Sequence, residues 1–223
     1  MSFNVAIDGP AGAGKSTVAK SVAALKNFIY VDTGAMYRAM ALFMLREGVD
    51  PADAAAIADK CKEADITIQY VDGEQVVLLN GENVNAYLRT EEVGNMASTT
   101  SAQPAVRTKL VELQQALATK SDVIMDGRDI GTVVLPHAQV KIYLTASSMV
   151  RAKRRYDELT AKGESCDLGK IRQDIEDRDY RDMHRETSPL KQAEDAVLLD
   201  SSDMTLKEVV DAIVAMIEKK QGA

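Results

Sequence analysis

The chain is short of aromatic residues and of cysteine. It has no tryptophan, and phenylalanine and tyrosine together account for only 4% of its 223 residues. Aliphatic side chains and methionine must therefore fill the interior, and a hydrophobic share of 46% is ordinary for one packed core. The two cysteines, Cys61 and Cys166, lie far apart and match no metal-binding spacing, so we expect neither a disulfide framework nor a zinc site.

Long apolar runs and an excess of basic residues are also missing. No segment approaches the roughly 20 apolar residues that span a bilayer, and no leader pattern opens the chain, so we expect a cytoplasmic protein without a membrane partner. A formal net charge of −7 argues against a nucleic-acid polymer as partner. Arginines nevertheless cluster at 151–155 and 172–185, which fits a small polyanionic ligand.

What the sequence does contain is an alternation of strand-like and helix-like segments. Pro51, after Asp50 as N-cap, is expected to begin a helix that ends near Ala64, and Thr205 and Glu208 form a capping-box pattern. The β-rich stretch Ile66–Leu88 interrupts the alternation and predicts a small antiparallel insertion. The expected strands are 3–8, 28–32, 122–126, 140–145 and 196–200; the other expected helices are 15–24, 34–46, 104–118, 150–162, 170–185 and a last one from 205.

This order predicts a three-layer α/β fold, in which a five-stranded parallel sheet carries helices on both faces. We expect a single domain over 1–223, with the insertion at 64–94 and a lid-like helical segment at 150–188. Ligands bind beyond the carboxyl ends of the strands in such folds. Polar or glycine-rich segments follow the expected strands at 9–16, 32–38, 126–129 and 200–203.

One of these segments matches the phosphate-binding pattern GxxxxGK(S/T), directly after an apolar strand and at the start of a helix. Its glycines let the backbone N–H groups surround a phosphate, Lys15 supplies a cation to the β- and γ-phosphates, and Ser16 offers a hydroxyl to Mg²⁺. Asp126 ends a later apolar strand, where a carboxylate can face the water shell of that ion. The expected ATP site is Gly9, Pro10, Ala11, Gly12, Ala13, Gly14, Lys15, Ser16 and Thr17.

A phosphate-binding loop does not by itself name the reaction. The segment Thr119–Asp122 matches the guanine-reading pattern of GTPases, but it precedes a strand instead of following one, and the chain contains no DxxG. Arg178, Arg181 and Arg185 recur at helical spacing on one face, and a second basic helix precedes them. Guanidinium groups offset the repulsion between donor and acceptor phosphates, so the pattern favours a kinase whose two basic helices close as a lid.

Taken together, the motifs resemble those of the bacterial cytidylate kinases, from about Val5 to the last helix. The resemblance is carried by IDGPAGAGKST at Ile7–Thr17, DTGAMYR at Asp32–Arg38, RTEEV at Arg89–Val93, DGRDIGTVV at Asp126–Val134 and RDYRDMHRETSPL at Arg178–Leu190. It implies transfer of the γ-phosphoryl group of ATP to CMP, and to dCMP, with Mg²⁺ as cofactor and the protein as a monomer.

The resemblance also implies roles for individual residues. Lys15, Arg128, Arg178 and Arg185 are the expected catalytic residues, while Ser16 and, through water, Asp126 would hold the metal ion. The acceptor phosphate would be bound by Arg38, Arg128 and Arg185 beside Thr33 and Tyr37, the cytosine edge by Ser98, Arg107 and Asp129, and the ribose by Arg178 and Asp182.

Two alternatives stay open at this point. A related kinase could act on UMP, AMP or a hydroxyl acceptor, and the pairing of Asp129 with Arg107 is the feature that distinguishes cytosine. A nucleotide-binding switch that hydrolyses slowly would release ADP without any acceptor, and the missing DxxG argues against it.

Overall fold

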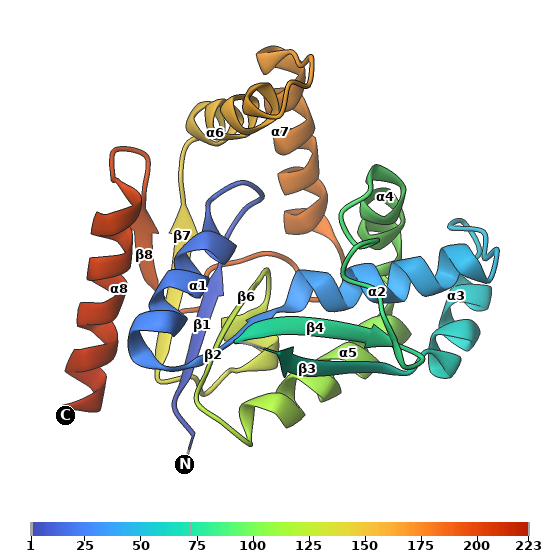
Figure 1. Cartoon of the computed structure of the whole chain (residues 1–223), viewed down its shortest axis with the longest axis horizontal. Helices are drawn as coiled ribbons and strands as arrows, with labels where there is room; N and C mark the ends of the chain where they lie inside the picture. Colours follow the sequence, from blue (N-terminus) through green and yellow to red (C-terminus); the bar gives the residue numbers. More distant parts are fainter. Residues whose placement is uncertain (1, 72, 223) are drawn as a thin grey trace. The chain divides into compact units, whose positions relative to one another are not determined.

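The computed structural model describes residues 2–71 and 73–222. The chain divides into two compact units, which Figure 1 colours along the sequence. The first unit holds the chain up to Phe28 and again from Asp122 onward, and the second holds Ile29–Ser121.

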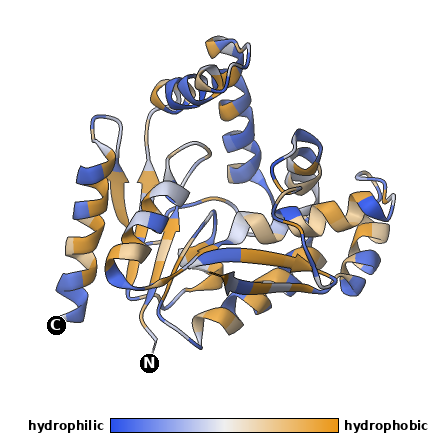
Figure 2. Cartoon of the chain, viewed as in Figure 1, coloured by the Kyte–Doolittle hydropathy of each residue, from blue (hydrophilic) through white to orange (hydrophobic). Residues whose placement is uncertain are grey.

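The first unit is a parallel sheet with helices around it. In β1, Val5 is aligned with Ile124 of β6 and with Val140 of β7, so β1 has a parallel partner on each side. The apolar colouring of β1 and β7 in Figure 2 agrees with their burial. Its elements are β1 (Asn4–Asp8), α1 (Lys15–Lys26), β6 (Val123–Gly127), the π-helical turn η2 (Ile130–Val134), β7 (Val140–Thr145), α6 (Ser148–Ala161), α7 (Leu168–His184), β8 (Val197–Asp200) and α8 (Leu206–Gln221).

Over the described residues, the five strands of the larger sheet follow the order β2-β6-β1-β7-β8, in which β2 is Ile29–Asp32. The pairs β1–β6, β1–β7 and β7–β8 are all parallel. The predicted α/β fold with a five-stranded parallel sheet is therefore confirmed. Because parallel strands share one direction, the loops after β1, β6, β7 and β8 all leave the sheet at its carboxyl edge.

The second unit contains the predicted antiparallel insertion. In the described part of the chain, β3, β4 and β5 form a three-stranded sheet, and Ile66 of β3 pairs with Leu79 of β4. Its helix α4 was not among the predicted elements. The bounds are β2 (Ile29–Asp32), α2 (Thr33–Arg46), α3 (Ala54–Lys60), η1 (Cys61–Glu63), β3 (Ile66–Val71), β4 (Glu74–Leu79), β5 (Glu82–Asn83), α4 (Glu91–Thr100) and α5 (Pro104–Ala118).

The predicted start of α3 at Pro51 is wrong. The Asp50 carboxylate accepts a hydrogen bond from the backbone N–H of Ala52 at 2.8 Å, which closes a local turn. The helix begins three residues later, where Asp53 caps it by accepting from Ala56 N–H at 2.9 Å. Two aspartates compete for the same role, and the one whose geometry continues into a helix is Asp53.

Other boundaries follow the sequence closely. Helix α5 covers the predicted 104–118, and the capping box of Thr205 and Glu208 opens α8. The described residues include no helix with the combined length and apolar character that a bilayer crossing requires.

Candidate active site

The loop from Gly9 to Gly14 leads from β1 into α1 and leaves the N-terminus of that helix open. Gly9 has φ 149°, and a Cβ atom there would lie 1.9 Å from the carbonyl oxygen of Leu144, so a larger residue does not fit. Gly14 is the N-cap of α1, with φ 86°, and provides no side-chain cap. The first N–H groups of α1 can therefore bind an anion such as a phosphate.

Lys15 follows this N-cap and is 5% exposed. Its ammonium donates a hydrogen bond to the carbonyl oxygen of Pro10 at 2.7 Å. Burial, and next the nearby Arg128 guanidinium, lower the pKa of Lys15 from 10.5 to about 7, while Asp126 and Asp8 act in the opposite direction. A phosphate bound in the loop would favour the charged form of this lysine.

The predicted metal-binding pair is brought together at the next position. The Ser16 hydroxyl donates to Oδ2 of Asp126 at 2.9 Å, and Asp126 is only 6% exposed at the end of β6. A hydroxyl and a carboxylate are oxygen donors of the kind that Mg²⁺ prefers, and Mg²⁺ keeps several waters in nucleotide sites. These two side chains therefore fit the expected ion.

Asp8 anchors the loop that carries Arg128 and Asp129. Its Oδ1 accepts from Ile130 N–H and its Oδ2 from Gly131 N–H, both at 2.7 Å, so one carboxylate binds two consecutive amides of η2. Burial raises the pKa of Asp8 from 3.8 to about 6, although these two hydrogen bonds lower it. The end of β1 thereby fixes the backbone that directly follows Asp129.

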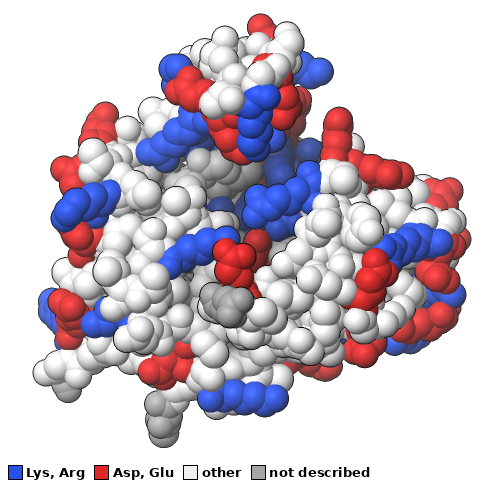
Figure 3. All heavy atoms as spheres, viewed as in Figure 1, with Lys and Arg blue, Asp and Glu red and all other residues white. Residues whose placement is uncertain are grey.

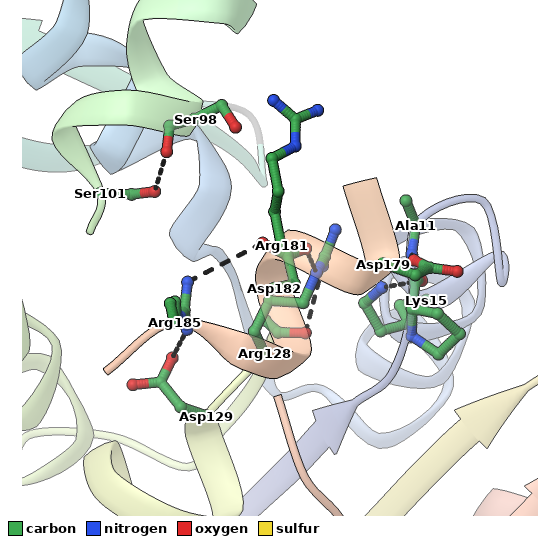
Figure 4. Close-up of polar contacts among 12 residues, drawn as sticks. Ala11, Lys15, Ser98, Ser101, Arg128, Asp129, Asp179, Arg181, Asp182 and Arg185 are labelled. Carbon is green, nitrogen blue, oxygen red and sulfur yellow. Dashed lines mark hydrogen bonds and ion pairs between the residues drawn. The ribbon is translucent and has the colours of Figure 1, made fainter. Parts of the chain in front are cut away.

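Arginines and carboxylates from the turn between β6 and η2 and from the C-terminal end of α7 meet in one cluster (Figure 4). Arg128 Nε donates to Asp182 Oδ2 at 2.8 Å. Arg185 reaches Asp129 at 3.6 Å and Asp182 at 3.9 Å, and its Nε donates to Ser188 O at 2.7 Å. Burial would raise the pKa of Asp182, but Arg128, Arg178 and Arg185 lower it overall.

The tip formed by α6 and α7 has a different surface character. Acidic and basic side chains alternate there at the top of Figure 3, in agreement with the ion pairs Arg155–Glu158 and Lys162–Glu158. Such exposed pairs add about 0–1 kcal/mol each. The basic cluster at 151–155 is therefore partly a solvated helix surface, whereas its member Arg151 is buried.

In the second unit, Asp32 organises the start of α2. Its carboxylate caps the helix by accepting from Ala35 N–H at 2.9 Å and contacts Arg38 at 3.3 Å. Gln75 of β4 holds the Asp32 backbone at both ends, because its Oε1 accepts from Asp32 N–H at 2.8 Å and its Nε2 donates to Asp32 O at 3.2 Å. The insertion thus supports the segment that carries Arg38.

The other predicted residues of this unit lie on α2, α4 and α5. The Arg107 guanidinium lies 5.3 Å from the ring centre of Tyr37, and its Nη1 donates to Ser101 O at 3.1 Å. Thr33 and Arg107 are both 3% exposed. Ser98 is half-buried on α4, and its carbonyl oxygen accepts from the Ser101 hydroxyl at 3.3 Å.

The structure therefore gathers the predicted residues into a group within each unit. In the second unit, Arg107 lies beside Tyr37 of α2, the helix that also carries Thr33 and Arg38, and Ser98 lies on α4. In the first unit the residues are Lys15, Ser16, Asp126, Arg128, Asp129, Arg178, Asp182 and Arg185. Sequence reasoning did not single out Asp8, Gln75 and Asp179 as candidate site residues, and it named Arg151 only as part of a basic cluster. For Asp8 a signal was available, since a carboxylate ends an apolar strand directly before the glycine loop.

The glycine loop, its buried lysine, the hydroxyl–carboxylate pair and the parallel sheet together define a P-loop kinase. The comparisons give the particular family. The model of the cytidylate kinase family matches residues 5–219, and the chain belongs to that family.

Individual relatives agree with this assignment. The cytidylate kinase of Lactobacillus gasseri is 53% identical over 98% of this chain and 95% of its own length, and that of Bacillus subtilis is 46% identical over 98% and 97%. Among solved structures, an uncharacterized protein from Eubacterium ventriosum covers 98% of this chain and 99% of its own, with a TM-score of 0.53 at 12% identity. That last likeness concerns the fold alone.

Proposed function

We propose that this enzyme transfers the γ-phosphoryl group of ATP to CMP, giving ADP and CDP, and that the residues gathered above carry the reaction. The bond between the γ-phosphorus and the β,γ-bridging oxygen breaks, and a bond from a CMP phosphate oxygen to that phosphorus forms. The observation that carries the proposal is the buried Lys15 at an open helix N-terminus, beside Arg128 and Arg178, in a chain of the cytidylate kinase family.

On the donor side, the loop Gly9–Thr17 binds the phosphates of ATP. Its N–H groups and Lys15 balance the charge of the β- and γ-phosphates, and Arg178 adds a second cation close to Lys15. Ser16 and Asp126 would hold Mg²⁺, in the case of Asp126 through water. That ion, when bound, supplies further charge neutralisation to the phosphate oxygens.

On the acceptor side, arginines hold the CMP phosphate in line with the donor. Arg38, Arg128 and Arg185 are the proposed phosphate ligands, beside Thr33 and Tyr37. Each of these arginines already contacts a carboxylate, at Asp32, at Asp182, or at Asp129 and Asp182. Because these carboxylates already hold the guanidinium groups, the arginines are oriented before the substrate binds. The incoming phosphate would replace the carboxylates or share the arginines with them.

Recognition of cytosine depends on a carboxylate and a donor. Asp129 accepts from the N4 amine of cytosine, while Arg107 donates to O2 or N3 and Ser98 adds a hydroxyl. Uracil presents an oxygen where cytosine presents its amine, and a buried acceptor left facing it is unfavourable. Arg178 and Asp182 bind the ribose. The 2′-deoxy analogue dCMP shares the phosphate and the base, so it is a substrate as well.

Two segments serve the reaction as movable parts. The insertion at 64–94 supports the monophosphate side through Gln75, and 150–188 acts as a lid that excludes water. The enzyme works as a monomeric single domain in the cytoplasm on free nucleotides. Its two unpaired thiols and its net charge of −7 support a reducing compartment and the lack of a nucleic-acid partner.

A coupled assay of ADP release with a panel of nucleoside monophosphates tests this function. We expect ADP release to depend on CMP or dCMP, and to be much slower with UMP and AMP. ADP release without any acceptor would instead support a nucleotide-dependent switch. Arg185→Ala is expected to raise KM for CMP far more than KM for ATP, and unchanged CMP kinetics would remove Arg185 from the acceptor site.

A further inference from the structure

A buried ion pair holds the backbone of the phosphate loop at Ala11. Arg151 of α6 donates through Nη1 to Asp179 Oδ2 at 2.6 Å and to Ala11 O at 2.7 Å. Asp179 of α7 accepts through Oδ1 from Ala11 N–H at 3.0 Å. Both polar groups of one loop residue are therefore bound by the pair, and Figure 4 shows Asp179 beside Ala11 and Lys15.

The pair is well satisfied for a buried one. Arg151 and Asp179 are each 6% exposed, and Arg151 Nε has a further acceptor in Ala146 O at 2.8 Å. A buried ion pair often adds little to stability compared with apolar side chains, whereas the loss of one partner leaves a charge that the interior disfavours. Stability alone is thus a weak reason for this arrangement.

The packing of the next residue connects the same two helices to the loop. A Cβ atom on Gly12 would lie 3.4 Å from Cβ of Arg151 and 3.8 Å from Cδ1 of Ile175. The loop backbone therefore lies directly against α6 and α7 at two consecutive positions. This contact is independent of the ion pair and fixes the same stretch of chain.

The charge of Asp179 matters because of where it lies. Its carboxylate binds an amide of the loop that receives the triphosphate, and a bare carboxylate there would repel the ligand. Arg151, at 2.6 Å, offsets that charge and is held by the loop itself. The ion pair therefore holds the loop backbone in place at Ala11 without adding net negative charge to the phosphate site.

We propose that Arg151 and Asp179 are positioning residues for the phosphoryl donor: together they fix the loop at Ala11, and Arg151 neutralises the carboxylate that does so. Neither residue needs to touch ATP for this effect. The inference rests on the proposed ATP site and adds the groups that shape it.

A double-mutant cycle tests the charge argument. Arg151→Met leaves the Asp179 carboxylate uncompensated, and we expect it to weaken binding of a non-hydrolysable ATP analogue about tenfold or more. Asp179→Asn keeps an acceptor for Ala11 N–H and removes the negative charge, so its loss of affinity for the analogue should stay within about threefold. The combined variant should recover most of the affinity that Arg151→Met loses.

Binding is measured by titration calorimetry, with the CMP affinity and the melting temperature recorded for each variant. Arg46→Met is the matched control, because Arg46 pairs with exposed Glu82 and is not a proposed ligand of either nucleotide; it should bind the analogue as the unaltered enzyme does. Arg151→Lys retains the positive charge but lacks the planar guanidinium group. Its affinity for the analogue should lie between that of the unaltered enzyme and that of Arg151→Met. If Arg151→Met does not fold, Arg151→Lys and the combined variant still give the comparison.

The outcomes separate this inference from the proposed function. Weak analogue binding by Arg151→Met, recovered in the combined variant and with CMP affinity unchanged, supports it. Unchanged analogue binding by Arg151→Met overturns it, and so does a combined variant that binds as poorly as Arg151→Met. If the unaltered enzyme itself does not bind the analogue, the proposed function fails instead.

Discussion

The buried ammonium of Lys15 makes proton uptake a reporter of nucleotide binding. Because the pKa of Lys15 is lowered to about 7, most of the free enzyme holds it neutral at pH 8. A bound triphosphate favours the charged form, so binding at pH 8 should take up close to one proton per site, whereas near pH 6 the lysine is already charged and uptake should be small. Titration calorimetry in buffers with different ionisation enthalpies measures this uptake.

Lys15→Arg is the matched control for that experiment. Its guanidinium stays charged at both pH values, so nucleotide binding should take up no proton at pH 8. The interpretation fails if the arginine variant takes up as many protons as the unaltered enzyme. Lys15→Ala should still lower kcat strongly, because it removes a cation from the transferred group.

Asp8 is expected to make the stability of the folded protein depend on pH, because its pKa is raised by burial. With a pKa of about 6 in the folded protein and 3.8 as its ordinary value, Asp8 makes the folded state bind more protons than the unfolded state in that pH window. Its contribution to stability therefore falls as the pH rises from about 4 to about 6, by ~3 kcal/mol in total. The free energy of unfolding of the unaltered protein, compared with Asp8→Asn by urea titration, should decline across that range, and a flat or rising difference would contradict it.

Base selection should depend on Asp129. In Asp129→Asn the side-chain amide can donate to the O4 oxygen of uracil, which the carboxylate cannot do. We expect the ratio of kcat/KM for CMP to that for UMP to fall at least about tenfold. An unchanged ratio would assign cytosine recognition to other residues, whereas an equal loss with both substrates would point to disruption of the Arg185 contact.

Among the helices and strands, β4 is predicted to act on the substrate site through one side chain. Gln75→Ala removes both hydrogen bonds to the Asp32 backbone, which are worth about 1 kcal/mol each, and so loosens the start of α2 that carries Arg38. We expect KM for CMP to rise several-fold while KM for ATP stays unchanged. Gln69→Ala, at an exposed position of neighbouring β3, is the control and should leave both values as they are.

The elements that could be predicted from the sequence are those whose determining residues lie close together in the chain. Helix α5 begins at a proline and α8 at a capping box, and both patterns lie within a few residues of the helix that they define. The same holds for the glycine loop, whose chemistry is contained in eight positions. The predicted start of α3 was wrong because Asp50 and Asp53 both carry a side chain that can cap a helix, and only the backbone geometry distinguishes them.

The residues that sequence reasoning missed depend on partners far away in the chain. Asp179 lies among the arginines of α7 in the sequence, but its partners are Arg151 and Ala11, 28 and 168 residues distant. Gln75 similarly binds Asp32 across 43 residues. No local pattern encodes such contacts, because they arise only when the strands and helices have packed.

At the scale of the whole molecule, the two substrates should protect different segments from hydrogen exchange. The proposed donor ligands Gly9–Thr17 belong to the first unit, whereas Thr33, Arg38 and Arg107 belong to the second. Backbone amides that gain a ligand or a stiffer environment exchange more slowly. An ATP analogue alone should therefore slow exchange in 9–17 and leave 32–38 unaffected, while CMP alone should slow exchange in 32–38 and in 128–131, where Arg128 and Asp129 lie.

Mass spectrometry of peptic fragments after short labelling times measures this pattern. The C-terminal helix α8 serves as an internal control, because no proposed ligand residue lies within it, and its exchange should not respond to either nucleotide. UMP at the same concentration should give weaker protection than CMP in both acceptor segments, since uracil has no N4 amine that could donate a hydrogen bond to Asp129. Equal protection of 9–17 by CMP and by the ATP analogue would contradict the division of donor and acceptor roles, because it would mean that the loop around Lys15 does not distinguish a triphosphate from a monophosphate.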